Sequence, residues 1–198
     1  MRPASFRLLP SPFCDQRPAG MPIDLLVVHA ISLPPGCFGG TEVDELFLGQ
    51  LDQRDWGPEP PPFYEDVAGL RVSAHFLIDR QGRITQYVPI AKRAWHAGES
   101  FWQGRVRCND FSVGVELEGD AYTLFEPVQY RRLATLIKTV HRGLLQQGWG
   151  AIGRQQVVGH EHIAPGRKWD PGPFFEWDTL WWWLDRARPA RRWPLVWL

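Results

Sequence analysis

The chain has 198 residues, of which 44% are hydrophobic and 22% charged, a composition typical of one folded domain. Its 22 Lys and Arg balance 22 Asp and Glu, so charge gives no reason to expect nucleic acid or an anionic membrane as a partner. No window reaches the roughly 18 apolar residues that a membrane span needs. The first 12 residues lack the apolar run of a secretory signal. Three cysteines without a paired motif, Cys14, Cys37 and Cys108, complete a pattern that predicts a cytoplasmic protein.

The first third of the chain predicts one buried strand followed by a long connection. Residues 1–23 are expected to form an irregular leader. The apolar, β-branched run from Leu25 to His29 predicts a buried strand that ends at a polar residue. The stretch from Leu33 to Pro62 is rich in Gly and Pro, and a loop of this length in a compact domain is usually functional. A short helix is expected within it at 42–48, where Val43, Leu46 and Phe47 share one side.

The middle of the chain predicts three strands. The segments 73–79 and 83–88 flank Arg80-Gln81-Gly82, which is typical of the turn of a hairpin. The segment from Phe111 to Glu118 alternates between apolar and other residues, so a strand with one apolar and one polar face is expected there.

The last third predicts two helices around another strand. Apolar residues recur at helical spacing from Pro127 to Gln147, with Pro127 suited to the first turn and Gly148 to the stop. A strand is expected over 157–160, ending in His160, and a helix from about Pro173 to Ala187. Mixed strands and helices without a dividing linker predict a single α/β domain over 1–198, with a central mixed sheet. The core is expected at 23–187, with a Trp- and Arg-rich tail at 188–198.

The tryptophans near the C-terminus, at 181–183, 193 and 197, allow two interpretations. Tryptophan beside arginine can mark an interfacial membrane contact. The alternative is a helix that packs its aromatic side on the domain, followed by a tail lying over it, and we favour this packing.

Two histidines at strand ends and one later carboxylate form a candidate metal site. Ligand sites gather at strand ends in α/β sheets, which is where His29 and His160 are expected. Asp170 follows ten residues after His160. Two imidazoles and a carboxylate suit catalytic zinc, because three protein ligands leave one position open. A strand through His160 and His162 would place both on one side, so a triad of His29, His160 and His162 remains an alternative.

Two further residues are candidates for catalysis. Glu116 lies on the polar face of its predicted strand, where Gly114 is expected to leave the face open. A carboxylate beside a metal could act as general base and then general acid. Glu118 on the same face is the rival, and a solvent-facing role is possible for both. Lys168, two residues before Asp170, could stabilise an oxyanion or could be a surface lysine.

Long sequence blocks carry a family resemblance. They are LLVVHAISLPPGCFGG (Leu25–Gly40), LRVSAHFLIDRQGRITQYVP (Leu70–Pro89), KRAWHAGES (Lys92–Ser100), GRVRCNDFSVGVELEG (Gly104–Gly119) and GHEHIAPGRKWDPGP (Gly159–Pro173). With short matches near the start, they cover about residues 11–180. In these blocks the chain resembles the AmpD-type 1,6-anhydro-N-acetylmuramyl-L-alanine amidases. These belong to a wider amidase family that includes phage T7 lysozyme and the peptidoglycan recognition proteins.

The resemblance implies a T7 lysozyme-like fold and zinc-dependent hydrolysis of the amide between (1,6-anhydro-)N-acetylmuramic acid and L-alanine. The partner it implies is a small muropeptide of peptidoglycan recycling. It implies that zinc is bound by His29, His160 and Asp170, and that Glu116 and Lys168 act in catalysis. It also implies that Arg71 and Arg107 hold the substrate through carboxylates of the stem peptide, and that His75 and His96 are structural or line the pocket.

The chain departs from the family pattern near the proposed metal. Ala30 stands where the family usually has Asn, Glu161-His162 where it has Ser-Asp, and Trp169 where it has Thr. These changes leave pocket shape and fine substrate contacts open. Two other functions are carried as alternatives: a non-catalytic peptidoglycan-binding module, and a hydrolase of intact cell wall.

Overall fold

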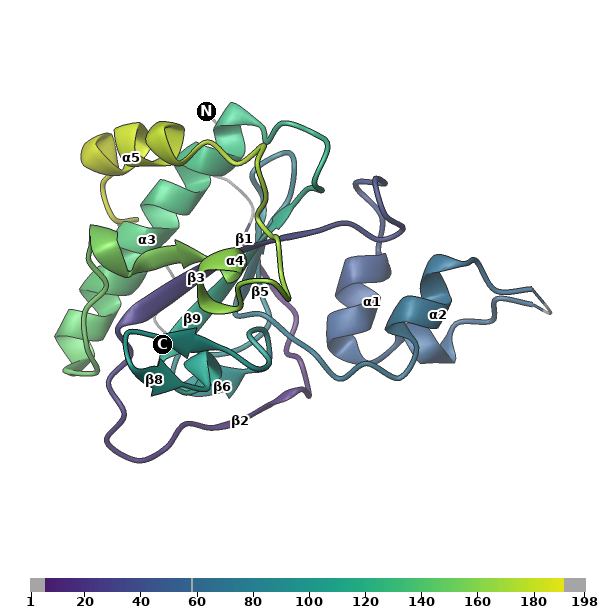
Figure 1. Cartoon of the computed structure of the whole chain (residues 1–198), viewed down its shortest axis with the longest axis horizontal. Helices are drawn as coiled ribbons and strands as arrows, with labels where there is room; N and C mark the ends of the chain where they lie inside the picture. The colour runs from purple at the N-terminus through teal and green to yellow at the C-terminus, as the bar shows by residue number, and fades with distance from the viewer. Residues whose placement is uncertain (1–5, 58, 191–198) are drawn as a thin grey trace.

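A six-stranded mixed sheet forms the centre of the protein (Figure 1). The computed structural model describes residues 6–57 and 59–190. The strands lie in the order β1 (Phe6–Leu8), β5 (Ile84–Gln86), β4 (Phe76–Ile78), β9 (Ser112–Glu118), β3 (Leu25–Ile31) and β10 (Val157–Gly159). Only the hairpin pair β4–β5 is antiparallel among these neighbours. The predicted α/β class, the mixed sheet and the hairpin are therefore confirmed.

Two smaller sheets and several short helical turns complete the fold around the central sheet. β2 (Cys14–Gln16) pairs with β6 (Lys92–Ala94), and β7 (Phe101–Trp102) pairs with β8 (Arg105–Val106). The short helical elements are η1 (Leu51–Gln53), η2 (Cys108–Asp110), η3 (Arg154–Gln156) and α4 (His160–Ile163).

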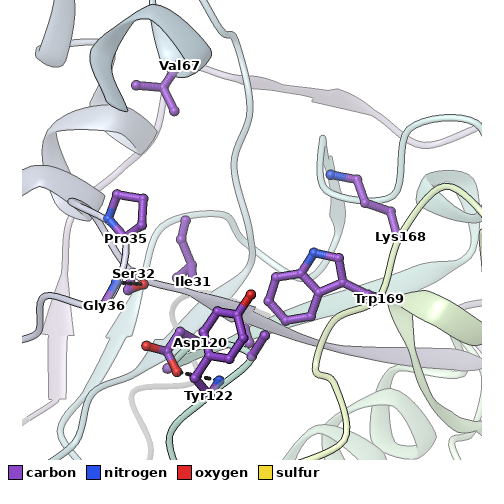
Figure 2. A pocket seen from close by; sticks show the side chains of 12 residues that line it. Ile31, Ser32, Pro35, Gly36, Val67, Asp120, Tyr122, Lys168 and Trp169 are labelled. Atoms are coloured by element: carbon purple, nitrogen blue, oxygen red, sulfur yellow. Dashed lines mark hydrogen bonds between the residues drawn. The ribbon is translucent and has the colours of Figure 1, made fainter. Parts of the chain in front are cut away.

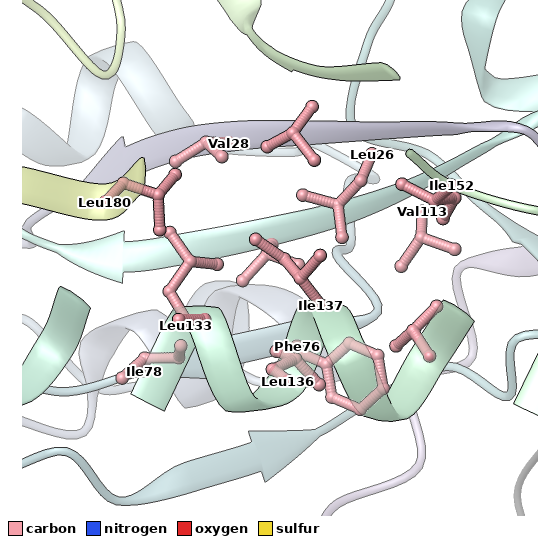
Figure 3. Packing of buried hydrophobic residues seen from close by; sticks show 14 of the residues in the cluster. Leu26, Val28, Phe76, Ile78, Val113, Leu133, Leu136, Ile137, Ile152 and Leu180 are labelled. Atoms are coloured by element: carbon pink, nitrogen blue, oxygen red, sulfur yellow. The ribbon is translucent and has the colours of Figure 1, made fainter. Parts of the chain in front are cut away.

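Helices α3 (Pro127–Gln147) and α5 (Trp177–Arg186) cover one face of the sheet (Figure 1). Side chains alternate along each strand, so one set from neighbouring strands meets these helices. Figure 3 shows Leu26, Val28 and Val113 of the sheet above Leu133 and Ile137 of α3. The helix has the predicted bounds, and Gly148 ends it in the left-handed conformation. This packing leaves the alternate side chains of β3 and β9 for the opposite face.

A second apolar cluster supports the other side of the molecule. Helices α1 (Glu42–Leu48) and α2 (Phe63–Val67) stand apart from α3 and α5 (Figure 1). The predicted short helix at 42–48 is confirmed, and its apolar side joins a buried cluster with residues of β4 and of the segment after β5. The long Gly- and Pro-rich connection is thus partly folded into a lobe with its own core.

Three local predictions were wrong. The leader is not irregular throughout, because Phe6–Leu8 adds an edge strand to the main sheet and Cys14–Gln16 pairs with β6. The final helix begins at Trp177 rather than near Pro173. The polar side of β9 is not open as predicted, since all seven residues of the strand are buried. The two short strands within the leader form by pairing with distant strands, and no local periodicity in the sequence marks them.

The aromatic side of α5 faces the core. Trp177, Trp181 and Trp183 are partly buried against the main cluster, whereas Trp182 is half exposed. This is the packing that we favoured for the helix. The tail after it is described only to Ala190, whose carbonyl accepts a hydrogen bond from Arg142 of α3, so the expectation for 191–198 lies outside the described residues. No helix in the described part of the chain is long and apolar enough to cross a membrane.

Candidate metal centre

Two of the candidate side chains come from neighbouring strands at the same register. His29 of β3 pairs with Glu116 of β9, and the strands are parallel. Side chains at paired positions point to the same face of a sheet. Leu26 and Val28 of β3 pack toward α3, so His29 and Glu116 project from the opposite face. His29 is not the last residue of its strand, which continues to Ile31.

The other two candidates are brought together by close packing after β10. His160 does not end the strand as predicted, because β10 stops at Gly159 and His160 begins the helical turn α4. A Cβ on Gly159 would lie 2.7 Å from Cδ of Pro171, so only glycine permits this approach. The backbone N–H of Glu161 donates to the Asp170 carbonyl at 3.0 Å. Both contacts hold Asp170 beside His160.

His29, His160 and Asp170 converge on one point. Nδ1 of His29 lies 3.0 Å from both Nδ1 of His160 and Oδ2 of Asp170, and the last two atoms are 3.1 Å apart. All three residues are buried, and their ligand atoms lie within 4.8 Å of one another. Burial acts to raise the pKa of the Asp170 carboxyl, but hydrogen bonds and charge from the two imidazoles together outweigh it and hold that pKa well below its usual range, while burial lowers the pKa of His29. Two imidazoles and one carboxylate form a donor set that could hold a metal ion.

The outer nitrogens of both imidazoles are already occupied. Nε2 of His160 is 3.1 Å from the Ala97 carbonyl, which can only accept, so this nitrogen carries the proton and Nδ1 is free to bind a metal. Nε2 of His29 is 3.0 Å from Nδ1 of His96, and Nε2 of His96 is 3.3 Å from the Ser112 hydroxyl. Outer hydrogen bonds of this kind fix the tautomer and orientation of metal-binding histidines.

His96 is a site residue for which the sequence assigned no definite role. Its ring occupies the space above Gly114, where a Cβ would lie 2.5 Å from Cγ of His96. The sequence predicts that Gly114 leaves this face of the strand open. Instead, its missing side chain makes room for the histidine that contacts His29. The other histidine considered, His75, is fully buried and structural. Its Nδ1 accepts a hydrogen bond from the Gly114 N–H, and its Nε2 lies 3.1 Å from the Lys92 carbonyl oxygen.

Glu116 is a buried carboxylate without a full set of partners. It is 8% exposed, and its Oε2 has no hydrogen-bond partner among the residues that the structure describes. Burial, followed by repulsion from Asp170, raises its pKa well above the usual value, while the positive charge of Lys168 acts in the opposite sense. Because its pKa is raised, this carboxylate can accept a proton and keep it.

Glu118 and His162, the two residues left open as alternatives, have other partners in the structure. Glu118 is also buried, but its oxygens accept the backbone N–H groups of Gly39 and Arg80, so it connects loops. His162 does not join His29 and His160. Its Nδ1 accepts the Gly159 N–H at 2.8 Å and its ring packs near Trp177. The alternative triad fails because residues 160–163 form a helical turn and not a strand.

The remaining candidates, Lys168, Arg71 and Arg107, are exposed, and Lys168 is the one of these three that lines the cavity at the centre. A cavity of about 290 Å³ opens onto the centre, and its lining includes His29, Glu116, His160, Asp170 and the exposed Lys168. Arg71 and Arg107 are exposed and are not among the described residues that line this cavity, although Leu70 and Val72 on either side of Arg71 are. Arg107 lies 3.4 Å from Asp110 and has a positive φ of 62°.

Comparison with known proteins identifies the family. Residues 19–173 match the family model described as N-acetylmuramoyl-L-alanine amidase. The chain belongs to the N-acetylmuramoyl-L-alanine amidase family. Within this amidase family it is 52% identical over 171 residues to the 1,6-anhydro-N-acetylmuramyl-L-alanine amidase AmpD of Salmonella typhimurium strain SL1344, covering 86% of each chain.

Solved amidase structures agree with this membership. The crystal structure of a selenomethionine AmpD derivative matches with a TM-score of 0.79 and 47% identity, covering 92% of this amidase and 96% of that chain. The amidase AmiD from E. coli, in complex with anhydro-N-acetylmuramic acid-L-Ala-D-gamma-Glu-L-Lys, matches with a TM-score of 0.57 and 32% identity. That match covers 85% of this chain and 60% of AmiD. The T7 lysozyme-like amidase fold expected from the sequence is confirmed.

Proposed function

We propose that this amidase hydrolyses the amide between 1,6-anhydro-N-acetylmuramic acid and the L-alanine of the stem peptide, as a zinc enzyme of peptidoglycan recycling. The observation that carries the proposal is the buried convergence of His29, His160 and Asp170 beside the unpartnered carboxylate of Glu116. The AmpD relatives, about half identical over most of the chain, support the substrate.

Zinc fits the donor set of this centre. Two imidazole nitrogens and one carboxylate are a common arrangement at catalytic zinc sites, and three ligands leave a position open to the cavity. When bound, zinc supplies Lewis acidity, which polarises a carbonyl and makes water more acidic. His96 and the Ala97 carbonyl hold the two imidazoles in the orientation that presents Nδ1.

Glu116 moves the proton in this proposal. Its free Oε2 accepts a proton from the water that attacks the lactyl carbonyl carbon. Burial favours the neutral carboxyl, so Glu116 retains that proton while the tetrahedral carbon forms. It then donates the proton to the departing alanine nitrogen as the C–N bond breaks. One group thus acts first as base and then as acid.

Lys168 and two arginines have supporting roles. The Lys168 ammonium lines the cavity and would stabilise negative charge on the carbonyl oxygen. Arg71 and Arg107 are exposed, Arg71 lies between two residues that line the cavity, and both would attract carboxylates of the stem peptide. We further propose that residues 1–198 form one amidase domain. All three cysteines, Cys14, Cys37 and Cys108, are described and free, which supports a cytoplasmic location.

The experiment that tests the function is product analysis by mass spectrometry. The purified protein is incubated with anhydro-N-acetylmuramyl-tripeptide, and in parallel with intact sacculi. We expect free tripeptide and anhydro-N-acetylmuramic acid from the first and little product from the second. Faster release from sacculi would favour a hydrolase of intact wall. No cleavage of either, by a protein that binds the muropeptide, would favour a binding module.

A further inference from the structure

One short segment of the chain contacts the outer nitrogens of both candidate metal-binding imidazoles. Nδ1 of His96 lies 3.0 Å from Nε2 of His29, and the carbonyl oxygen of Ala97, the next residue, accepts from Nε2 of His160 at 3.1 Å. The segment of residues 96–99 belongs to no helix or strand. Regular secondary structure therefore does not fix the direction of the Ala97 carbonyl, and other contacts must do so.

Arg167 supplies such a contact from the loop that leads to Asp170. Nη2 of its guanidinium donates to the Ala97 carbonyl at 2.7 Å and also to the Glu99 carbonyl. The Ala97 oxygen thus accepts from both His160 and Arg167, which uses both of its lone pairs. A hydrogen bond from a charged donor is shorter and stronger than one from a neutral donor. The bond from Arg167 is therefore well suited to hold this oxygen in place.

The peptide plane that carries this oxygen has few other restraints. Oδ1 of Asn109 accepts the N–H groups of His96 and Ala97, at 3.1 and 2.8 Å, and so holds the preceding part of the segment. The Ala97 carbonyl lies in the next plane, before the exposed Gly98, whose φ of +56° favours glycine. Among the described residues, removal of Arg167 leaves this oxygen with the His160 bond alone.

The neighbours of Arg167 in its loop face the cavities, but Arg167 does not. Lys168 and Trp169 line both the cavity over the metal centre and a second cavity of about 700 Å³, into which they point in Figure 2. Arg167 is not among the described residues that line either cavity. Its guanidinium instead lies against the turn at Gly98, where a Cβ would be 3.4 Å from Nη1 and Nη2. This is the place of a support and not of a substrate contact.

From these contacts we infer that Arg167 is a positioning residue of the metal centre, which holds the Ala97 carbonyl toward His160 and ties the loop of Asp170 to residues 96–99. The inference rests on the proposed zinc-dependent function and deepens it. The three candidate metal ligands are then connected to one segment, through His96, Ala97 and Arg167. Since ligands held in place bind a metal more tightly, loss of Arg167 should weaken metal binding.

The test measures metal affinity without any substrate. Zn²⁺ is titrated into metal-free protein in competition with a chelator. We expect Arg167→Ala to bind Zn²⁺ about tenfold more weakly than the wild type, the lower end of the loss for a direct outer partner. The visible absorption bands of bound Co²⁺, which report the geometry of its ligands, should also change. Arg167→Lys keeps the charge but not the planar fork, and should recover part of the affinity.

Arg186→Ala is the matched control. Arg186 is also exposed, and its Nη1 donates to the backbone carbonyl of Trp182 at 2.9 Å, but both residues lie on α5. This variant loses the same charge and the same kind of bond, and it should leave the Zn²⁺ affinity and the Co²⁺ spectrum unchanged. Urea unfolding of the metal-free proteins identifies a purely structural role, which would lower the free energy of unfolding of Arg167→Ala without changing its Zn²⁺ affinity.

Two results would overturn the inference. One is equal Zn²⁺ affinity in the wild type and Arg167→Ala. If the KM for anhydro-N-acetylmuramyl-tripeptide then rises in this variant, Arg167 is a substrate contact instead. The other is an equal loss of affinity in Arg186→Ala, which would reduce the effect to net charge. If the wild type binds zinc but cleaves no muropeptide, the proposed function fails, while the zinc titration of the same proteins still decides the inference.

Discussion

Replacing Glu116 with Gln should decrease activity and increase stability at the same time. The carboxylate is 8% exposed and its Oε2 has no partner within residues 6–57 and 59–190, so the folded protein pays a desolvation penalty whenever Glu116 is charged. Gln has the same shape but no charge and cannot accept the proton. Loss of a general acid–base group typically costs about 10²–10⁴ in rate, so turnover of Glu116→Gln should fall by that factor.

The stability change has a definite pH dependence. Burial and the charge of Asp170 raise the pKa of Glu116, so the folded state binds the proton more tightly than the unfolded state. The contribution of Glu116 to stability is therefore complete below its unfolded pKa and is lost as the pH rises through its folded pKa. In metal-free protein, Glu116→Gln should gain on the order of 1–3 kcal/mol at pH 8, the usual penalty of a buried unpaired group, and almost nothing at pH 4.

Glu118→Gln is the matched control on the same strand. Glu118 is 7% exposed, but both of its oxygens accept backbone N–H groups. An amide can satisfy only one of them, so this variant should lose about 1–3 kcal/mol while turnover changes only severalfold. Urea unfolding of the metal-free proteins at several pH values measures both effects. A Glu116→Gln protein that is less stable than the wild type at pH 8, or equally active, would refute the reasoning.

Three further predictions concern the metal centre and its neighbours. Lys168→Ala should lower turnover by about 10²–10³ while zinc content, measured by atomic emission, stays the same, and unchanged turnover would remove Lys168 from the mechanism. His96→Ala should weaken zinc binding by about 10–100-fold in competition with a chelator, because Nε2 of His29 loses its partner. His162→Ala should leave zinc affinity unaltered, since its ring bonds the Gly159 N–H, and a large loss would revive the alternative triad.

The elements that the sequence predicts well are those whose signal is local. The helix from Pro127 to Gln147 has helical periodicity, a proline in its first turn and a glycine stop, and its bounds are confirmed. The hairpin of β4 and β5 and the alternating strand β9 are also confirmed. The strand at Phe6–Leu8 was missed because three residues carry no periodicity, and its stabilisation comes from β5, almost eighty residues away.

The sequence predicts three residues that converge in the structure, His29, His160 and Asp170, but it does not predict their surroundings. Spacing alone left His162 open as a ligand, and the turn that begins at His160 decides against it. The alternation of β9 predicts a polar face that Gly114 leaves open beside Glu116, whereas His96 occupies the space over Gly114 on that face. A glycine in a strand can signal such a close approach, but it does not identify the partner. That partner lies in a separate loop, so only the folded arrangement reveals it.

The central claim is that His29, His160 and Asp170 hold one zinc ion that is required to cleave the muramyl–alanine amide. Titrating zinc into chelator-treated protein, while free tripeptide is quantified by mass spectrometry, tests it most directly. Activity should be absent without metal and should rise linearly to a plateau at one zinc per chain, and Asp170→Ala should not recover over the same range. Full activity in metal-free protein, or full recovery of Asp170→Ala at one zinc per chain, would contradict the account.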